Sequence, residues 1–347
     1  MIEQVNIPTG ASSMPLVSIC IPVYNGADYL TCALQSACGQ TYLKTEIIVV
    51  DNASTDETHA IAANFAVRDP RVRIVRNDDN LGMVGNWNRC LELAQGEWIK
   101  FLCHDDLLAS DCLERMLQAN TANNDVVICA RKFLIEPNAD PKLQKFFTTG
   151  IISFQELGLT GSISPAQVAA AMSKVAPLYN FLGEPNCILF RRRCVAEVGT
   201  FHPWFALYSD FDYWLRLAVT RSITVVPEPL ASFRVHGGST TAKTLTQQFR
   251  NNYLDPLLLI WLFLNNPKHR KFLQQYPIVR HKWQERMRLL LQEIRCDEEM
   301  SHLFDTWLTD HPEAPHNLGK LSLATNLRLT LSQLYWQCRH AWRNWRD

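Results

Sequence analysis

The chain alternates between short apolar runs and segments whose apolar residues recur at helical spacing. The apolar runs, each about as long as a buried strand, occupy residues 16–26, 46–51, 72–75, 98–102 and 124–130. The intervening segments carry apolar residues three or four positions apart, which is typical of amphipathic helices. Because such alternation favours strands joined by crossover helices, the pattern predicts an α/β domain with a mostly parallel sheet flanked by helices.

The second half of the chain departs from this regular alternation. Residues 136–165 lose clear periodicity, and we expect an irregular excursion there. A helix is predicted from Phe211 to Val219, followed by a strand at 223–226 that is expected to end before Pro227 and Pro229.

After about Thr240 the strand signals vanish and long segments with helical apolar spacing take over. The pattern therefore divides the chain into a flexible N-terminus (1–15), an α/β domain (16–240) and a helical C-terminal region (241–347).

Composition narrows the class of protein. Lys plus Arg and Asp plus Glu both number 34 in 347 residues, so no overall field favours a nucleic-acid partner. The N-terminus lacks the pattern of a signal peptide, and the run Leu257–Leu264 is too short to span a bilayer. Eleven cysteines without a CxxC pair indicate reduced, buried thiols rather than a disulfide framework, and hence a cytoplasmic protein.

Two adjacent carboxylates, Asp105 and Asp106, follow the apolar run 98–102 directly. Open α/β sheets bind ligands at the carboxyl ends of their strands. Paired carboxylates there suit Mg²⁺ or Mn²⁺, especially an ion shared with phosphates. The alternative is that both residues only cap a helix from Leu107 to Met116.

Four sequence blocks together resemble the family 2 glycosyltransferases. They read VSICIPVYNGADYL, EIIVVDNASTDET, NLGMVGNWNRCLELAQGEWIKFLCHDD and SDFDYWLRLA, in that order along the chain. The resemblance covers roughly residues 16–240. It implies a GT-A fold and an inverting transferase that uses a nucleotide-sugar.

The resemblance implies a nucleotide pocket after the first strands. Pro22, Tyr24 and Asn25 would line it, and Asp51 would accept hydrogen bonds from the base. A carboxylate only accepts hydrogen bonds, so Asp51 would favour a base with an N–H group, such as uracil. The alternative for Asp51 is a turn residue at the end of a strand.

Three further residues are implied to border the donor. Asn80 and Gly82 would shape the loop beside the nucleotide and sugar, and Asn86 would contact the donor. Asp106 would orient the site or touch the sugar. A turn followed by a helix cap is the alternative for the residues between 80 and 86.

The family's metal motif is altered in this chain. Asp105 matches the second acid, which would bind a Mn²⁺ or Mg²⁺ cofactor on the diphosphate, but Cys103 replaces the first acid. His236 would be a second metal ligand in the closing loop. Arg234 would meet phosphate or form a structural ion pair.

The resemblance places the catalytic base at Asp210, which would take the proton of the acceptor hydroxyl. Ser209 replaces the glutamate that usually precedes it. Asp212 and Arg216 stand four residues apart and are expected to pair locally. Glu184 is a candidate sugar contact.

The last predicted helix begins at Leu327 and combines Trp342 and Trp345 with several arginines. A basic helix rich in tryptophan suits the surface of an anionic membrane. We expect either peripheral contact with the inner face of the plasma membrane or packing of this helix on the catalytic domain.

The resemblance thus implies transfer of a sugar, UDP-linked in the first instance, to a glycan or lipid-linked acceptor in cell-surface polysaccharide synthesis. The alternative is a catalytically lapsed GT-A protein that binds glycan or membrane, an idea supported by Cys103 and Ser209. A dinucleotide-dependent dehydrogenase is disfavoured because no GxGxxG motif follows the first strand.

Overall fold

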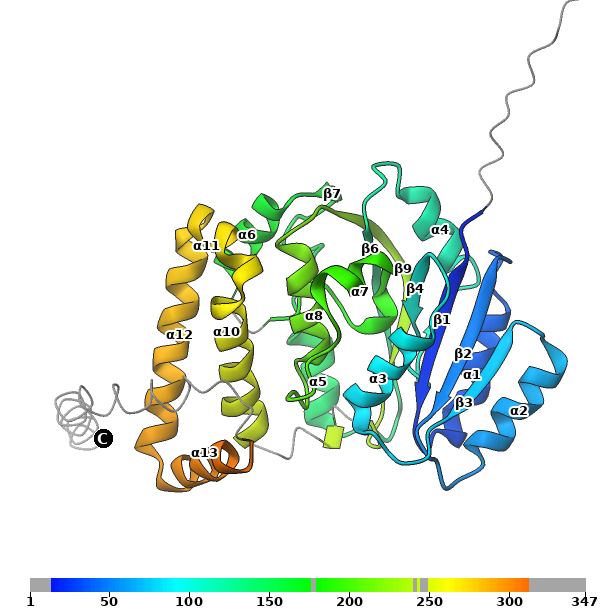
Figure 1. Ribbon diagram of the computed structural model, residues 1–347, viewed down its shortest axis with the longest axis horizontal. Coiled ribbons are helices and arrows are strands. Elements are labelled where there is room, and N and C mark those ends of the chain that lie inside the picture. Colours follow the sequence, from blue (N-terminus) through cyan, green and yellow to red (C-terminus); the bar gives the residue numbers. More distant parts are fainter. Residues whose placement is uncertain (1–13, 176–178, 240–241, 244–248, 312–347) are drawn as a thin grey trace, which may run out of the picture.

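The computed structural model describes residues 14–175, 179–239, 242–243 and 249–311. Within them, one nine-stranded sheet has the order β3-β2-β1-β4-β8-β6-β9-β5, and β7 pairs with β9 (Figure 1). The strands are β1 (Val17–Val23), β2 (Thr45–Asp51), β3 (Val72–Arg76), β4 (Trp98–Phe101), β5 (Leu107–Leu108), β6 (Val126–Ile135), β7 (Gly161–Ile163), β8 (Ile188–Arg191) and β9 (Ile223–Val235).

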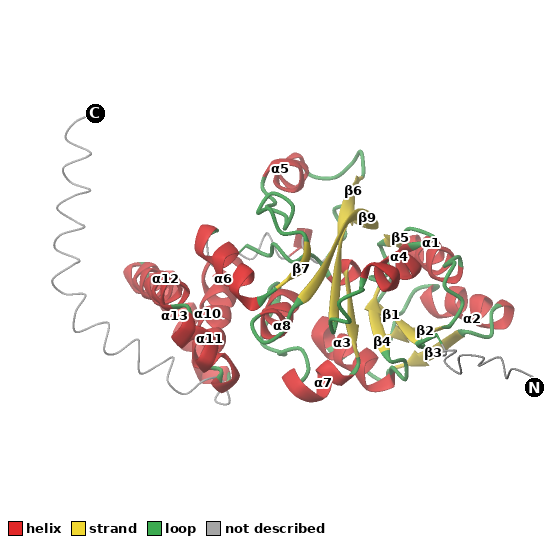
Figure 2. Ribbon diagram, turned by 90° about the horizontal axis from the view of Figure 1, so that it is seen from above, coloured by secondary structure: helices red, strands yellow, loops and turns green. Residues whose placement is uncertain are grey.

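The first four strands form a parallel half-sheet with β1 at its centre, paired to both β2 and β4. Every residue of β1 is buried, which explains its continuous apolar run. Its crossover helices are α1 (Ala27–Cys38), α2 (Thr58–Arg68) and α3 (Gly82–Leu93). Helices α1 and α2 cover one face and α3 the other (Figure 2). Because these strands are parallel, their carboxyl ends lie together at one edge of the sheet.

The other half of the sheet is mixed. Strand β8 runs antiparallel to β4 and β6, whereas β6 and β9 are parallel. The helices associated with this half are α4 (Cys112–Ala119), α5 (Pro141–Thr149), α6 (Pro165–Lys174), α7 (Arg193–Val198) and α8 (Ser209–Ala218). The predicted α/β sheet flanked by helices is confirmed, with the parallel pairs concentrated in its N-terminal half.

Strand β9 is longer than the sequence predicts, because it continues through Pro227 and Pro229 to Val235. The pairing with β6 shifts register on both sides of Ala130, opposite the prolines. A bulge tolerates residues that lack an N–H group, so the prolines bend the strand without ending it. This extension carries the chain from the core to residue 236 at the site.

The predicted helix from Leu107 to Met116 is also wrong at its start. Residues 107 and 108 form β5, which pairs with β9, and α4 begins only at Cys112. Asp105 and Asp106 therefore do not cap a helix. Because strand β5 follows them, the alternative that they only cap a helix is excluded.

The C-terminal part of the described chain is helical, and it packs at the end of the molecule opposite β3 (Figure 1). Its helices are a π-helical turn (Arg250–Leu254), α10 (Asp255–Asn265), a 3₁₀ turn (Pro267–His269), α11 (Arg270–Gln275), α12 (Pro277–Cys296) and α13 (Glu298–Asp310). Among the described residues, no helix is long and apolar enough to cross a membrane. The predicted helix from Leu327 lies outside the described residues, and the domain boundaries stay predictions.

Candidate active site

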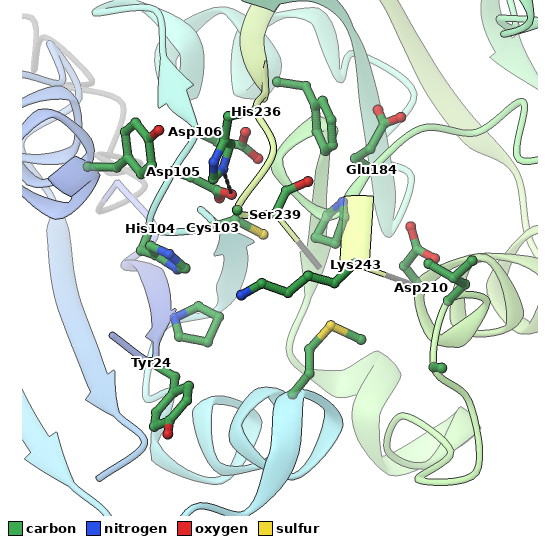
Figure 3. Close-up of a pocket in the computed structure, with 18 of the residues that line it drawn as sticks. Tyr24, Cys103, His104, Asp105, Asp106, Glu184, Asp210, His236, Ser239 and Lys243 are labelled. Atoms are coloured by element: carbon green, nitrogen blue, oxygen red, sulfur yellow. Dashed lines mark hydrogen bonds and ion pairs between the residues drawn. The ribbon is translucent and has the colours of Figure 1, made fainter. Parts of the chain in front are cut away.

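A cavity of about 1060 Å³ opens where β1, β2 and β4 end (Figure 3). It brings together ten of the eleven predicted site residues, from segments up to 214 positions apart (22 to 236). They are Pro22, Tyr24, Asn25, Asn80, Gly82, Asn86, Asp105, Asp106, Asp210 and His236. The eleventh, Asp51, is fully buried and is not among the lining residues.

The loop after β1 is tied to the loop after β2. Asn25 adopts a left-handed backbone (φ 47°), and its side-chain oxygen accepts a hydrogen bond of 2.8 Å from the Thr55 amide. The Asn25 amide donates to Ser54 Oγ at 2.9 Å. Tyr24 remains 45% exposed beside these contacts, so a rigid loop presents a ring to the cavity.

Asp51 is fully buried at the end of β2. Its Oδ1 accepts a hydrogen bond of 2.9 Å from the Ser54 amide. Its Oδ2 lies 3.4 Å from Arg76 Nη1 and 3.5 Å from His59 Nδ1, with no hydrogen-bond partner among the described residues. A buried carboxylate oxygen in that state has the capacity to accept a hydrogen bond from a ligand.

Asn80 and Asn86 belong to an amide network that supports the next loop. Asn80 Oδ1 accepts from Asn52 Nδ2 at 2.8 Å, and Asn86 Nδ2 donates to the Val50 carbonyl at 2.9 Å. Gly82 adopts φ +74°, a conformation that favours glycine. These contacts explain the loop shape, and the predicted donor contacts of the three residues stay predictions.

Asp105 and His236 both line the cavity and contact each other there. Asp105 Oδ2 lies 3.1 Å from His236 Nε2, although 131 residues separate them in sequence. The imidazole also packs on Tyr29, with ring centroids 4.5 Å apart. Burial opposes ionisation of Asp105, but the hydrogen bond and the charges of the neighbouring histidines lower its pKa.

The pKa of Asp106 is shifted in the opposite direction to that of Asp105. Its Oδ1 accepts from the Arg234 amide at 2.9 Å, whereas its buried Oδ2 has no hydrogen-bond partner in the described structure. Burial, and then the charge of Asp105, raise the pKa of Asp106 well above its usual range. Arg234 Nε donates to the Asp105 carbonyl and its guanidinium lies 3.5 Å from Glu136, so Arg234 has the contacts expected of a structural ion pair.

The acidic end of the cavity has the donor set of a divalent-cation site. Cys103 Sγ and oxygens of Asp105 and Asp106 lie within 4.8 Å of one another. Burial raises the pKa of the Cys103 thiol well above its usual range, which leaves the oxygen and imidazole donors better suited to a hard ion. Asp105 Oδ2 and His236 Nε2 lie 3.1 Å apart in their hydrogen bond, so an ion held by both would replace that bond.

Asp210 is the second residue of α8, so it lies inside the helix rather than at its N-cap. Its Oδ1 accepts from the Phe211 amide at 2.7 Å and its Oδ2 accepts from Asn180 Nδ2 at 3.2 Å. Burial raises the pKa of Asp210 to about 7. A carboxylate that titrates near neutrality is suited to act as a general base.

Asp212 points away from Asp210 and pairs with Arg216, as predicted. Arg216 Nε donates to Asp212 Oδ2 at 3.0 Å, and both side chains are 4% exposed. Arg216 also donates to the carbonyls of Val198 and Thr200. The pair therefore fixes α8 against the loop that follows α7.

The sequence prediction does not include Arg131, Asn180 and Lys243. Asn180 and Lys243 line the cavity, whereas Arg131 does not line it and pairs with Glu184 of the wall. Figure 3 shows Lys243 extending into the cavity between the two acidic ends. Arg131 interrupts the otherwise mostly apolar β6, which is a signal that the sequence contained. The side-chain contacts of Asn180 depend on the tertiary fold, and no local pattern predicts them.

Comparisons with known proteins identify related sequences and folds. Residues 18–178 match the profile of the family described as Glycosyl transferase family 2. The Mycobacterium tuberculosis protein MT1568, which is named as uncharacterized, is 32% identical over 267 residues, covering 75% of this chain and 81% of that protein. The succinoglycan biosynthesis protein ExoO of Rhizobium meliloti is 36% identical over 122 residues, covering 35% of this chain and 34% of that protein.

Two solved structures share the fold at low sequence identity. Residues 1–349 of Staphylococcus aureus TarS, in complex with UDP-GlcNAc, superimpose with a TM-score of 0.57 at 17% identity, covering 83% of each chain. The mannosyltransferase PcManGT from Pyrobaculum calidifontis, in complex with GDP-Man and Mn²⁺, has a TM-score of 0.53 at 17% identity and covers 93% of this chain and 88% of that one. The predicted GT-A fold with a helical C-terminal part is confirmed.

Proposed function

This chain belongs to glycosyl transferase family 2, and we propose that it inverts the anomeric centre of a sugar that it moves from a UDP-linked donor to a glycan or lipid-linked acceptor. We place this reaction in cell-surface polysaccharide synthesis, as the name of the relative ExoO suggests. The observation that carries the proposal is a cavity with Asp210 at one end and the Asp105–His236 pair at the other.

The nucleotide would bind over the loops that follow β1 and β2. Pro22, Tyr24 and Asn25 line this part of the cavity. Asp51 offers a buried oxygen that accepts no hydrogen bond from the described residues, and a base N–H would satisfy it. Asn80, Gly82 and Asn86 would border the ribose and sugar. The TarS complex with UDP-GlcNAc supports a UDP-linked donor.

Asp105 and His236 would hold a Mn²⁺ or Mg²⁺ ion, and the spare oxygen of Asp106 would complete the site or contact the sugar. The Mn²⁺ complex of PcManGT supports this assignment. Such an ion would neutralise the charge that develops on the departing diphosphate.

Asp210 would accept the proton of the attacking acceptor hydroxyl. The acceptor oxygen then forms its bond to the anomeric carbon while the bond from that carbon to the diphosphate breaks, releasing UDP. One displacement inverts the anomeric centre and needs no covalent enzyme intermediate. The pKa of about 7 supports this role, because about half of the carboxyl groups are ionised at neutral pH and the ionised form is basic enough to take a proton.

A donor panel tests this function. Purified protein with Mn²⁺ should release nucleotide from a UDP-sugar faster than from dTDP- or GDP-sugars, and Asp210→Asn should abolish transfer while binding UDP with wild-type affinity. Wild-type transfer by the variant would refute the assignment of the base. No turnover with any donor, despite UDP binding, would favour the lapsed binding protein suggested by Cys103 and Ser209.

Membrane attachment is proposed separately, because it depends on the predicted helix from Leu327. That helix would hold a cytoplasmic enzyme at the inner face of the plasma membrane. Removing residues 312–347 should lower cosedimentation with anionic vesicles to the background level that neutral vesicles give. Equal cosedimentation by the truncated and full chains would contradict the proposal.

A further inference from the structure

A buried ion pair stands beside Asp210. Arg131 Nε lies 2.5 Å from Glu184 Oε2, and the two side chains are only 4% and 16% exposed. Arg131 comes from β6, and its guanidinium also lies 5.2 Å above the Phe133 ring. Because desolvation offsets much of the attraction within a buried pair, stability alone gives a weak reason for keeping it.

The backbone fixes Glu184 at the cavity wall. Gly183 adopts φ +110°, and a Cβ there would lie 3.0 Å from Cys187 Cβ. The Cys187 amide donates to the Glu184 carbonyl at 2.9 Å, and Pro185 restricts the chain on that side. Glu184 is thus oriented both by its main chain and by Arg131.

Asn180 joins the segment that carries Glu184 to Asp210. Its Nδ2 donates to the Gly183 carbonyl at 3.0 Å and to Asp210 Oδ2 at 3.2 Å. Its Oδ1 accepts from the Gly183 amide at 3.1 Å. Figure 3 shows Glu184 and Asp210 at one end of the cavity and the proposed metal ligands Asp105 and His236 at the other.

We propose that Glu184 determines acceptor specificity by binding a second hydroxyl of an uncharged sugar acceptor, next to the hydroxyl that reacts at Asp210. This inference rests on the proposed function. Carboxylates only accept hydrogen bonds, so two of them suit a polyhydroxylated sugar and repel an anionic one. Arg131 is a positioning residue, because it orients Glu184 without lining the cavity itself.

The same arrangement links Glu184 to the base electrostatically. The charged and titratable groups around Asp210 include Glu184, Arg131 on β6, Cys103 after β4 and Tyr208 before α8, and Lys243 extends into the same cavity. Burial is the main cause of the raised pKa of Asp210; the charge of Glu184 raises it further and that of Arg131 lowers it. Removing only the Glu184 charge should therefore lower this pKa.

Kinetics of Glu184→Gln test the binding role, with the UDP-sugar that the wild type uses fastest and methyl glycosides of neutral hexoses or of glucuronic acid as acceptors. The KM for the neutral acceptor should rise at least tenfold, the donor KM should stay within twofold, and the acid limb of kcat/KM should move to lower pH. Glu228→Gln is the matched control, since Glu228 pairs with Arg115 outside the cavity. An unchanged acceptor KM, or an unmoved acid limb, would overturn the inference.

A stability cycle separates this inference from the proposed function, because it needs no turnover. Because loss of the Glu184 charge lowers the pKa of Asp210, ionised Asp210 should destabilise the fold less in the Glu184→Gln background. The stabilisation that Asp210→Asn gives at pH 8 should therefore be smaller in that background than in the wild type. Equal stabilisation in both backgrounds would overturn the coupling. If Glu184→Gln does not fold because Arg131 loses its partner, the Arg131→Gln/Glu184→Gln double variant replaces it, with the same tenfold rise in acceptor KM expected.

Discussion

Replacing Asp210 with Asn should stabilise the protein while abolishing transfer. The carboxyl group is held where burial disfavours its charge, and its pKa is about 7 instead of 3.8. A buried carboxylate of this kind opposes folding whenever it is ionised. The amide of Asn has similar shape and no charge, so the variant removes that penalty.

The sign and size follow from the two pKa values. Between them the folded state holds a proton that the unfolded state has lost, so stability falls as pH rises from about 4 to 7. The difference corresponds to about 4 kcal/mol above pH 7, at about 1.4 kcal/mol for each pH unit. This is an upper bound, because Asp210 lines an open cavity.

One hydrogen bond reduces the gain. Asp210 Oδ1 accepts from the Phe211 amide, so the Asn side chain would keep its oxygen there and turn its NH₂ group toward Asn180 Nδ2. The lost hydrogen bond costs about 1 kcal/mol. The expected net stabilisation at pH 8 is therefore about 3 kcal/mol, falling to zero or below near pH 4.

Urea unfolding of the wild type and the variant at pH 4, 6 and 8 measures this difference. Asp111→Asn is a matched control, because Asp111 is 43% exposed and pairs only loosely with Arg115 at 3.7 Å. Its effect should stay below about 1 kcal/mol at every pH. An Asp210→Asn variant that is no more stable than the wild type at pH 8, or equally stabilised at pH 4, would refute the reasoning.

Three further variants test other parts of the site. Asp105→Ala should weaken Mn²⁺-dependent UDP binding at least tenfold by calorimetry, and an unchanged affinity would contradict the metal assignment. Gly26→Ala places a Cβ 2.4 Å from His104 Cδ2 and should destabilise the fold by about 1–3 kcal/mol in urea unfolding; a neutral effect would mean that His104 moves freely. Asp255→Asn weakens the 2.7 and 2.8 Å hydrogen bonds that the amides of residues 206 and 207 donate to Asp255 Oδ2. These residues lead into α8, which carries Asp210, so kcat should fall while UDP affinity is retained. An unchanged kcat would show that residues 206 and 207 do not position α8.

The pattern of the sequence determines the local elements well where a single periodicity rules. The buried strands β1, β2 and β4 are mostly apolar runs, and the polar residues that follow them mark the cavity edge. Long-range pairing overrides local rules elsewhere. Pro227 and Pro229 predict the end of a strand, but the bulge in the β6–β9 pairing accommodates them.

By itself the sequence determined the α/β class and the acidic pair at Asp105, because each follows from a clear local pattern. Asp51 and Asp210 were candidates through the resemblance to family 2 glycosyltransferases. The resemblance already implied that Asp105 and His236 act together, and the tertiary structure brings them within 3.1 Å across 131 residues. The pairing of Arg131 with Glu184 beside the base was decided by the tertiary structure alone. The physical reason is that periodicity encodes which face of an element is buried, whereas contacts between side chains depend on how distant elements pack together.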